Sequence, residues 1–315
     1  MTGESRARVS QSGVDNRQST AKMTSTLAYR FRDGAIIDVE GPDRAEFLQG
    51  QLTQDVKTMR PGDTRPTAAL TPKGKLIFIG RLRMMPDRIR LLLSRVSRDI
   101  VLTHLRKYAA FQKVSVSDST DSVLRIGLYG SAGTAGLPEG AALLPGEGEF
   151  AGELLVPRAS SGELDSWLGA QGAVLVSNEE AEIRRVEAGR PRFGQDADQS
   201  HLPDEVGLDD AISTTKGCYV GQEIVARMRT YGRANRRLVG FRFPEGAIPA
   251  GALLKLPEEE EPGKVEQGRV TSSVRSPRFG AIGLGYAFRD VSLGGRLVSS
   301  ESPSRPAIVT ETRFA

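Results

Sequence analysis

The stretch Thr215-Lys-Gly-Cys-Tyr-Val-Gly-Gln-Glu-Ile-Val-Ala-Arg227 is the most distinctive part of this 315-residue sequence. Its two glycines allow sharp turns and the close approach of another segment. Glu223 begins a run with helical spacing, in whose first turn the helix dipole favours a carboxylate. Cys218 is therefore expected in a turn, two residues after Lys216 and just before a helix, and both features favour a thiolate. Cys218 and Lys216 are the candidate catalytic residues; the alternative is a small buried cysteine that acts as a hydrophobe.

The composition is that of a globular protein with more than one domain. A length of 315 residues exceeds what a single core usually holds, so two or three domains are expected. The apolar share of 38% and the charged share of 26% exclude a fibrous chain or one disordered over most of its length. The longest apolar runs fall far short of the roughly 20 residues that a membrane span needs, so no membrane is expected as a partner.

The small numbers of cysteines and histidines, and the net charge, limit the kinds of site and ligand that are expected. One cysteine cannot form an intrachain disulfide, which fits a reducing compartment. With only two histidines beside it, a closed zinc site is not expected, and one chain cannot supply the four thiolates of an iron–sulfur cluster. No metal site is predicted. The net charge of +4 and the pI near 9.3 are compatible with anionic ligands or RNA.

Residues 1–26 are predicted to form a disordered tail, because they are polar and almost free of large apolar side chains. They lack the apolar core of a secretory signal, so the expected compartment is the cytoplasm. An Arg- and Ser-rich start also suggests an organelle transit peptide, although Glu4 and Asp15 weaken that interpretation. The mitochondrial matrix therefore remains the alternative, and Met23 is a second possible start of the chain.

The remaining sequence predicts an α+β protein with an all-β end. A strand at 35–39, a helix from Gly41 whose apolar residues extend to Val56, and a hairpin at 75–93 precede a helix at 97–111. Strands near 122–129 and 153–157 flank a Gly-rich loop with a short element inside, and helices follow at 162–169 and 177–188. Ser177-Asn-Glu-Glu180 has the form of a capping box, which predicts that Ser177 caps the second of these helices. The expected division is an α+β core of 27–120 and 177–236, a second α+β subdomain of 121–176, and a β-barrel of 237–315. Six short alternating segments between Gly and Pro turns predict the strands of this barrel, at 238–243, 253–256, 268–274, 281–288, 296–299 and 307–312.

A second candidate region is Arg184-Arg-Val-Glu-Ala-Gly-Arg-Pro-Arg-Phe-Gly-Gln-Asp196. Glu187 lies near the end of a predicted helix, where the dipole disfavours an anion, and the four arginines around it could offset this. By spacing alone, an ion-paired solvated face is the simpler interpretation.

The segment Lys216-Gly-Cys-Tyr-Val-Gly-Gln-Glu223 closely resembles the signature of the YgfZ family, folate-binding proteins related to the T-protein (aminomethyltransferase) of the glycine cleavage system. The resemblance extends over most of residues 27–300. The other segments that carry it are Gly41–Asp55, Thr71-Pro-Lys-Gly-Lys75, Glu187-Ala-Gly with Phe193-Gly-Gln-Asp196, and Leu202-Pro-Asp-Glu205.

The resemblance implies a three-domain ring of the T-protein type around a central pocket for tetrahydrofolate. In the T-protein the counterpart of Glu187 meets the pterin, and a carboxylate suits this because the 2-amino-4-oxopterin edge offers paired N–H donors. Arg190 and Arg227 could receive the glutamyl carboxylates of folate. We also expect the thiol of Cys218 to face this pocket. The predicted cofactor-binding residues are Glu187, Arg190, Tyr219, Gln222, Glu223 and Arg227.

One departure from the T-protein concerns its activity. The T-protein has an acidic pair shortly after the glycine turn, whereas this chain has Lys75-Leu-Ile-Phe-Ile79. Neither Ile77 nor Phe78 can accept a proton or stabilise a developing ammonium. We therefore expect that this chain is not an aminomethyltransferase.

The leading hypothesis is a tetrahydrofolate-binding protein that uses Cys218 in the assembly or repair of iron–sulfur clusters in client enzymes, including enzymes that modify tRNA. Its expected partners are folate, the client proteins and, more weakly, tRNA. The alternative is a folate-dependent aminomethyltransferase or demethylase. A third interpretation is an RNA-binding module, because the run Arg227-Met-Arg-Thr-Tyr-Gly-Arg-Ala-Asn-Arg-Arg237 combines cations with an aromatic ring.

Overall fold

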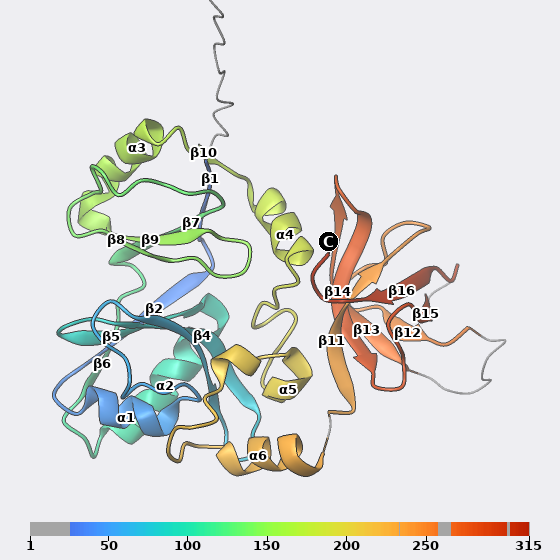
Figure 1. Cartoon of the computed structure of the whole chain (residues 1–315), viewed down its shortest axis with the longest axis horizontal. Helices are drawn as coiled ribbons and strands as arrows, with labels where there is room; N and C mark the ends of the chain where they lie inside the picture. The colour runs from blue at the N-terminus through green and yellow to red at the C-terminus, as the bar shows by residue number, and fades with distance from the viewer. Residues whose placement is uncertain (1–25, 233, 258–265, 301–302, 315) are drawn as a thin grey trace, which may run out of the picture.

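The computed structural model describes residues 26–232, 234–257, 266–300 and 303–314 (Figure 1). The predicted tail lies outside these ranges except for Thr26. Two α+β units lie one above the other, and a β-barrel stands beside them with helix α4 in between (Figure 1). This arrangement is the predicted α+β architecture with an all-β C-terminal barrel.

The first unit is an antiparallel sheet with the strand order β3-β4-β5-β2-β6. Two helices, α1 and α2, pack on one face and enclose a core that includes Leu48, Phe78 and Leu105. Edge strand β3 contains Pro66. Proline has no N–H to donate to a neighbouring strand, and an edge strand tolerates this because it has a neighbour on one side only. The bounds are β2 Gly34–Glu40, α1 Arg44–Gln51, β3 Thr64–Leu70, β4 Leu76–Met84, β5 Arg88–Ser94, η1 Arg95–Ser97, α2 Arg98–Ala109 and β6 Ser115–Asp118.

Helix α1 is shorter than its apolar spacing predicts. The expectation that it reaches Val56 is wrong, because the helix ends at Gln51 and Leu52 is already extended, with φ −114° and ψ 155°. Leu52 and Val56 are nevertheless fully buried in the same core. The apolar side chains after Gln51 therefore reach the core from an irregular segment.

The second unit is a sheet with the order β10-β1-β7-β9-β8, covered by α3, which carries the buried Trp167. It differs from the expected division in one respect: strand β1 belongs here and not to the 27–120 core, because it pairs with β7. The bounds are β1 Leu27–Arg30, β7 Val123–Leu128, β8 Ala142–Pro145, β9 Gly152–Pro157, η2 Arg158–Ser160, α3 Ser161–Ala170 and β10 Val174–Leu175.

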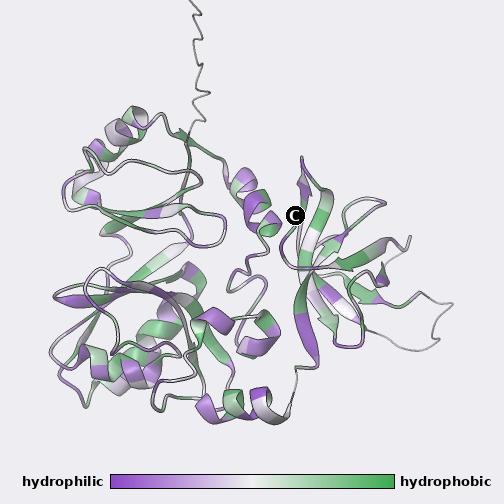
Figure 2. Cartoon of the chain, viewed as in Figure 1, coloured by the Kyte–Doolittle hydropathy of each residue, from purple (hydrophilic) through white to green (hydrophobic). Residues whose placement is uncertain are grey.

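The segment from Ser177 to Asn235 connects the α+β units to the barrel. The predicted cap of α4 is present, because Ser177 Oγ accepts the N–H of Glu180 at 3.1 Å. Helix α4 is hydrophilic over most of its length (Figure 2), as expected of a helix that bridges two units through polar contacts. The bounds are α4 Asn178–Glu187, α5 Pro203–Val206, η3 Asp209–Ala211 and α6 Gln222–Tyr231.

The C-terminal barrel is closed in the order β11-β14-β13-β12-β15-β16. Its interior is apolar, with Phe241, Leu254 and Val309 among the buried residues. The bounds are β11 Arg236–Arg242, β12 Leu253–Lys255, β13 Gly268–Ser276, β14 Gly280–Phe288, β15 Arg296–Ser299 and β16 Pro306–Thr310.

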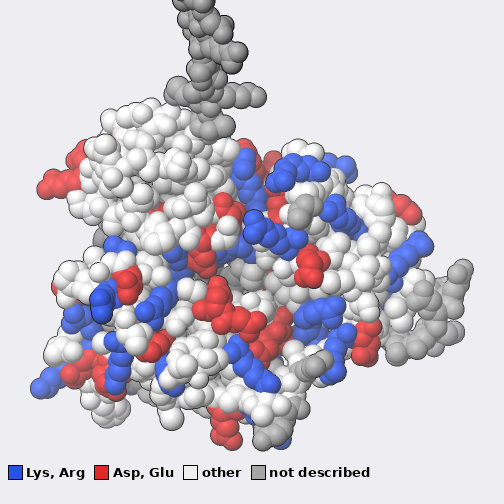
Figure 3. Space-filling model, viewed as in Figure 1, with Lys and Arg blue, Asp and Glu red and all other residues white. Residues whose placement is uncertain are grey.

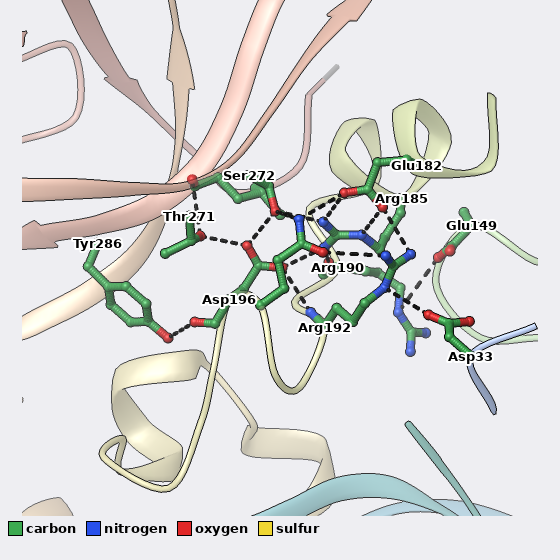
Figure 4. A network of polar contacts seen from close by, with 12 residues as sticks. Asp33, Glu149, Glu182, Arg185, Arg190, Arg192, Asp196, Thr271, Ser272 and Tyr286 are labelled. Atoms are coloured by element: carbon green, nitrogen blue, oxygen red, sulfur yellow. Dashed lines mark hydrogen bonds and ion pairs between the residues drawn. The ribbon is translucent and has the colours of Figure 1, made fainter. Parts of the chain in front are cut away.

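A buried carboxylate joins the barrel to the segment after α4. Asp196 accepts hydrogen bonds from the hydroxyls of Thr271 at 2.5 Å and Ser272 at 2.6 Å, both on β13. It also pairs with the Arg185 guanidinium of α4 at 2.7 Å. The backbone carbonyl of Asp196 accepts from the Tyr286 hydroxyl at 2.8 Å (Figure 4). Asp196 is therefore a polar joint between the barrel, helix α4 and the segment that follows it.

We predict that Asp196→Ala lowers the free energy of unfolding by about 3–5 kcal/mol, because it leaves a buried arginine without one of its carboxylates. Denaturant unfolding measures this, with the exposed Asp290→Ala as a control that should change stability by less than about 0.5 kcal/mol. Equal stability of the two variants would contradict the role of Asp196.

Candidate functional site

A central cavity lies between the two α+β units and the segment after α4. Its volume is about 160 Å³. The first sheet contributes one wall, the second unit another, and the residues after α4 a third. The lining residues used below are Phe31, Arg81, Glu149, Phe150, Arg190 and Arg192.

One wall of the central cavity is aromatic. The ring centroids of Phe31 and Phe150 are 5.3 Å apart, and Tyr29 packs edge-on against Phe31 at 5.2 Å. The Arg125 guanidinium lies 4.6 Å from the centroid of Phe31, within the range of a cation–π contact. Tyr29, Phe31 and Phe150 thus form an apolar part of the cavity lining.

Ion pairs between the two sheets form the floor of the cavity. Glu153 on β9 is buried and accepts from Arg81 of β4 at 2.9 Å and from Arg125 of β7 at 2.6 Å. Burial acts to raise the pKa of Glu153, but the two arginines outweigh it and hold that pKa below its usual value. The pairing fixes the first sheet against the second.

Three arginines near the cavity are already ion-paired (Figure 4). Besides Asp196, Arg185 pairs with Glu182 at 2.7 Å. Arg192 pairs with Glu182 at 2.9 Å, and Arg190 pairs with Glu147 at 3.2 Å. Each of these three guanidinium groups therefore has a carboxylate partner.

Glu149 lacks the close ion pairs that Glu147 and Glu153 make with arginines of the cavity. Its side chain is 10% exposed, and its nearest ion-pair contact is 3.6 Å, between Oε2 and Nε of Arg190. Within the part of the chain that the structure describes, Oε2 is buried and has no hydrogen-bond partner. Burial raises the pKa of this carboxyl.

Glu187 lies apart from the central cavity. Its Oε1 accepts the Ser276 hydroxyl of the barrel at 2.5 Å, and its Oε2 is 3.9 Å from the Arg278 guanidinium. It is not among the residues that line the cavity. The expected contact of Glu187 with a pterin thus does not follow from its position, because its carboxylate faces the barrel.

Lys216 has a role that differs from the expected one. Its ammonium donates to the backbone carbonyls of Gln49 and Leu52, each at 2.6 Å, and of Gln54 at 3.0 Å. These three acceptors occupy all three N–H donors of the ammonium, so none remains to pair with the sulfur. A cation at this place also complements the negative C-terminal end of α1. Lys216 therefore anchors the loop rather than activating Cys218 directly.

Two glycines with positive φ pack against each other beside this anchor. Gly221 has φ +85°, and a Cβ there would lie 2.6 Å from the carbonyl oxygen of Thr71. Gly74 has φ +73°, and a Cβ there would lie 2.7 Å from Ile224. The Thr71–Lys75 turn and the cysteine loop are thus in direct contact, and neither glycine has room for a side chain.

The cysteine loop places its side chains in different surroundings. Cys218 is exposed, whereas Tyr219 is buried in a core with Leu70 and Leu76. Gln222 accepts the backbone N–H of Tyr219 at 3.3 Å. Glu223 and Arg227 are exposed on α6.

Of the predicted site residues, the structure brings only Arg190 to the central cavity. The expectation that Cys218 faces the cavity is wrong, because the loop is anchored to the end of α1 and the sulfur points to solvent. Sequence reasoning missed Arg81, Glu149 and Glu153. The only sequence signal for Glu149 was the Gly-Glu-Gly-Glu run at 146–149, which reads as a loop.

Several known proteins are similar to this chain over most of its length, although no family model matches it. A tRNA-modifying protein YgfZ of Klebsiella pneumoniae is 30% identical over 257 residues, which cover 76% of this chain and 78% of that protein. The YgfZ of Yersinia pseudotuberculosis is 30% identical over 240 residues, covering 69% and 71%.

This chain belongs to the YgfZ family. The resemblance to this family that the cysteine motif indicated is therefore confirmed. A chloroplastic protein of Arabidopsis thaliana that carries the name of a transferase is 27% identical over 88% of the chain and 68% of its own length. Organellar relatives of this YgfZ-family chain thus exist.

The fold resembles that of aminomethyltransferase T of the glycine cleavage system from Bartonella henselae. The TM-score is 0.80 at 20% identity, over 92% of this chain and 86% of that one. This confirms the predicted T-protein-like fold. Ile77 and Phe78, which follow the glycine turn, are both buried in the core beneath α1 and α2.

The surface of this YgfZ-family chain carries mixed charge. Positive and negative side chains are interspersed on the face shown in Figure 3. In the basic run 227–237, Arg229 pairs with Asp204 and Asp209, and Arg236 pairs with Glu205. Among the described residues, no helix has the length and apolar character to cross a membrane.

We predict that Gly221→Ala is strongly destabilising, by at least about 1–3 kcal/mol, because φ is positive and the added methyl meets backbone. The matched control is Gly217→Ala, where φ is not positive and a Cβ has open space. Thermal unfolding of both variants measures the difference, and equal melting temperatures would contradict the packing described.

Lys216 also predicts a pH dependence of stability. Burial lowers its pKa to about 8, from 10.5. Between these values the unfolded chain holds more protons than the folded one, so this residue makes the free energy of unfolding rise with pH. In Lys216→Met the rise should be absent, although the variant is less stable because three carbonyls lose their donor. Denaturant titrations at pH 8 and 10 measure it, and parallel profiles for the two proteins would contradict the shift.

Proposed function

We propose that this chain binds tetrahydrofolate in the central cavity and acts through Cys218 in the assembly or repair of iron–sulfur clusters in client enzymes, including enzymes that modify tRNA. Family membership and the name of the YgfZ relatives as tRNA-modifying proteins support the link to tRNA modification. The T-protein fold supports a folate ligand. The observation that carries the proposal is a single exposed thiol on a well-anchored loop, separate from a cavity suited to a flat ring.

The residues of the cavity fit the head group of a folate. Phe31 and Phe150 offer ring faces, and the unpartnered Oε2 of Glu149 offers an acceptor. A volume of about 160 Å³ is below the roughly 300–1,000 Å³ of pockets that hold drug-sized ligands, so the cavity suits the bicyclic head rather than the whole cofactor. Tetrahydrofolate, when bound, would bring a carrier of one-carbon groups.

Aminomethyl transfer is not part of the proposal. The positions that follow the glycine turn carry Ile77 and Phe78, whose buried side chains can neither give nor take a proton. Bound folate is then a ligand of the protein and not a transfer substrate of the T-protein kind. Methylenetetrahydrofolate formation from an aminomethyl donor would overturn this point.

Cys218 can supply one ligand or one nucleophile. An iron–sulfur cluster takes about four thiolates, so the other ligands must come from the client or another partner. The exposed position of Cys218 permits such an encounter. A direct tRNA contact is the weaker alternative, because carboxylates already neutralise Arg229 and Arg236. The proposed compartment is the cytoplasm, with the mitochondrial matrix as the alternative.

We predict that Cys218→Ala folds normally and binds tetrahydrofolate as the unchanged protein does, because the thiol is exposed and outside the cavity. The variant should nevertheless fail to restore cluster-dependent enzyme activity in cells that lack the protein. Calorimetric titration and complementation measure the two parts. Thr214→Ala, an exposed change in the same loop, is the control and should complement fully.

Full complementation by Cys218→Ala would contradict the role of the thiol. Absence of binding heat with the unchanged protein would contradict the folate site. The two halves of the proposal can therefore fail separately.

A further inference from the structure

We propose that Glu149 is the residue that accepts the N–H edge of the heterocycle in the central cavity, and that Arg190, seated across Gly148, holds Glu149 in position. This inference rests on the proposed binding of a reduced folate. It assigns to Glu149 the task that the T-protein resemblance assigns to Glu187.

The first observation is an acceptor without a donor. Glu149 lies in the loop between β8 and β9, nine-tenths buried, and its Oε2 has no hydrogen-bond partner in the described part of the chain. An unpaired buried polar atom costs about 1–3 kcal/mol, and more when it is charged. Neighbouring Glu147 is held by Arg81 at 2.8 Å and Arg190 at 3.2 Å, and Glu153 by two arginines. Asp33 also lies 3.6 Å from its arginine, but its side chain is 47% exposed, so Glu149 is the buried carboxylate of the cavity lining without a close ion pair.

The second observation is the position of the Arg190 side chain, which lies against Gly148. Gly148 has φ +63°, and a Cβ at this position would overlap the Cδ and guanidinium of Arg190. The Arg190 side chain therefore crosses the loop at Gly148, where it pairs with Glu147 on one side and approaches Glu149 on the other. Figure 4 shows Arg190 beside Glu149. Its Nε is 3.6 Å from Oε2 of Glu149, close enough to attract the carboxylate and too far for a hydrogen bond. Arg190 is a positioning residue in this arrangement.

The third observation is the ring wall next to the carboxylate. Phe150 follows Glu149 directly, and its ring packs against Phe31 at 5.3 Å. A ligand ring that contacts this wall can turn its edge toward Oε2 of Glu149. A 2-amino-4-oxopterin has two adjacent N–H donors on that edge, which one carboxylate accepts as a pair.

The same geometry argues against Glu187. Its Oε1 already accepts the hydroxyl of Ser276, and the residue does not line the cavity. To reach a ligand there it would have to give up a contact that joins α4 to the barrel. Glu149 needs no such exchange.

The charged groups around Glu149 also predict how the affinity for a pterin depends on pH. Burial has the largest effect on Glu149 and raises the pKa of its carboxyl. The guanidinium groups of Arg190 and Arg185 lower this pKa, and the carboxylate of Glu147 raises it. The Tyr129 phenol also faces this carboxylate. Only the ionised form accepts two N–H donors. Pterin binding should therefore tighten as the pH rises through the pKa of Glu149, which lies above the usual value.

The test compares pterin with lumazine, which has a carbonyl in place of the 2-amino group and presents an acceptor to the carboxylate. Fluorescence titration of the full-length protein should show pterin bound roughly 10–100-fold more tightly than lumazine, as one charge-assisted hydrogen bond predicts. Glu149→Gln should lose this preference and its pH dependence, while Glu149→Asp should keep the preference at reduced affinity. Glu187→Gln should keep it, as should Glu139→Gln, an exposed control in the same unit.

The outcomes separate this inference from the proposed function. If the unchanged protein binds neither pterin nor tetrahydrofolate, both fail. If it prefers pterin and Glu149→Gln prefers it equally, the assignment to Glu149 is overturned while the folate site stands. Loss of the preference in Glu187→Gln alone would restore the assignment that the T-protein suggests.

Discussion

Three hydrogen bonds from one buried ammonium organise the region that identifies this family. The Nζ of Lys216 satisfies carbonyls at and just after the end of α1, and the backbone N–H of Val220 donates to Gly50 at 3.1 Å beside them. Helix carbonyls at a C-terminus need donors, and in this protein a segment more than 160 residues later in the chain supplies them. Helix α1 therefore ends where the cysteine loop docks, and the position of Cys218 follows from that docking.

The molecule keeps its two candidate sites apart. Cys218 is exposed on a loop that packs against the end of α1 and against the Thr71–Lys75 turn. The central cavity is closed by Glu153 and its two arginines and by the segment that Asp196 ties to the barrel, and Cys218 is not among the residues that line it. The proposed ligand and the proposed client would therefore contact different residues.

The sequence predicted the architecture well where local patterns were strong. The six barrel strands were expected from alternating segments between Gly and Pro turns, and the cap at Ser177 from its spacing to Glu180. Strand β3 was missed because Pro66 and two alanines give little strand signal. The pairing of β1 with the second sheet is a long-range choice that no local pattern encodes. The orientations of the Lys216 and Glu187 side chains could not be predicted from the sequence either, because both depend on hydrogen-bond partners far away in the chain.

Hydrogen exchange of the unchanged protein and Lys216→Met, followed by mass spectrometry, tests the anchor most directly. If the ammonium holds the loop to α1, peptides covering 44–52 and 216–222 should lose protection together in the variant, while barrel peptides keep theirs. Unchanged protection of the two segments would show that something other than Lys216 positions the cysteine, and would contradict the anchoring role on which the placement of Cys218 depends.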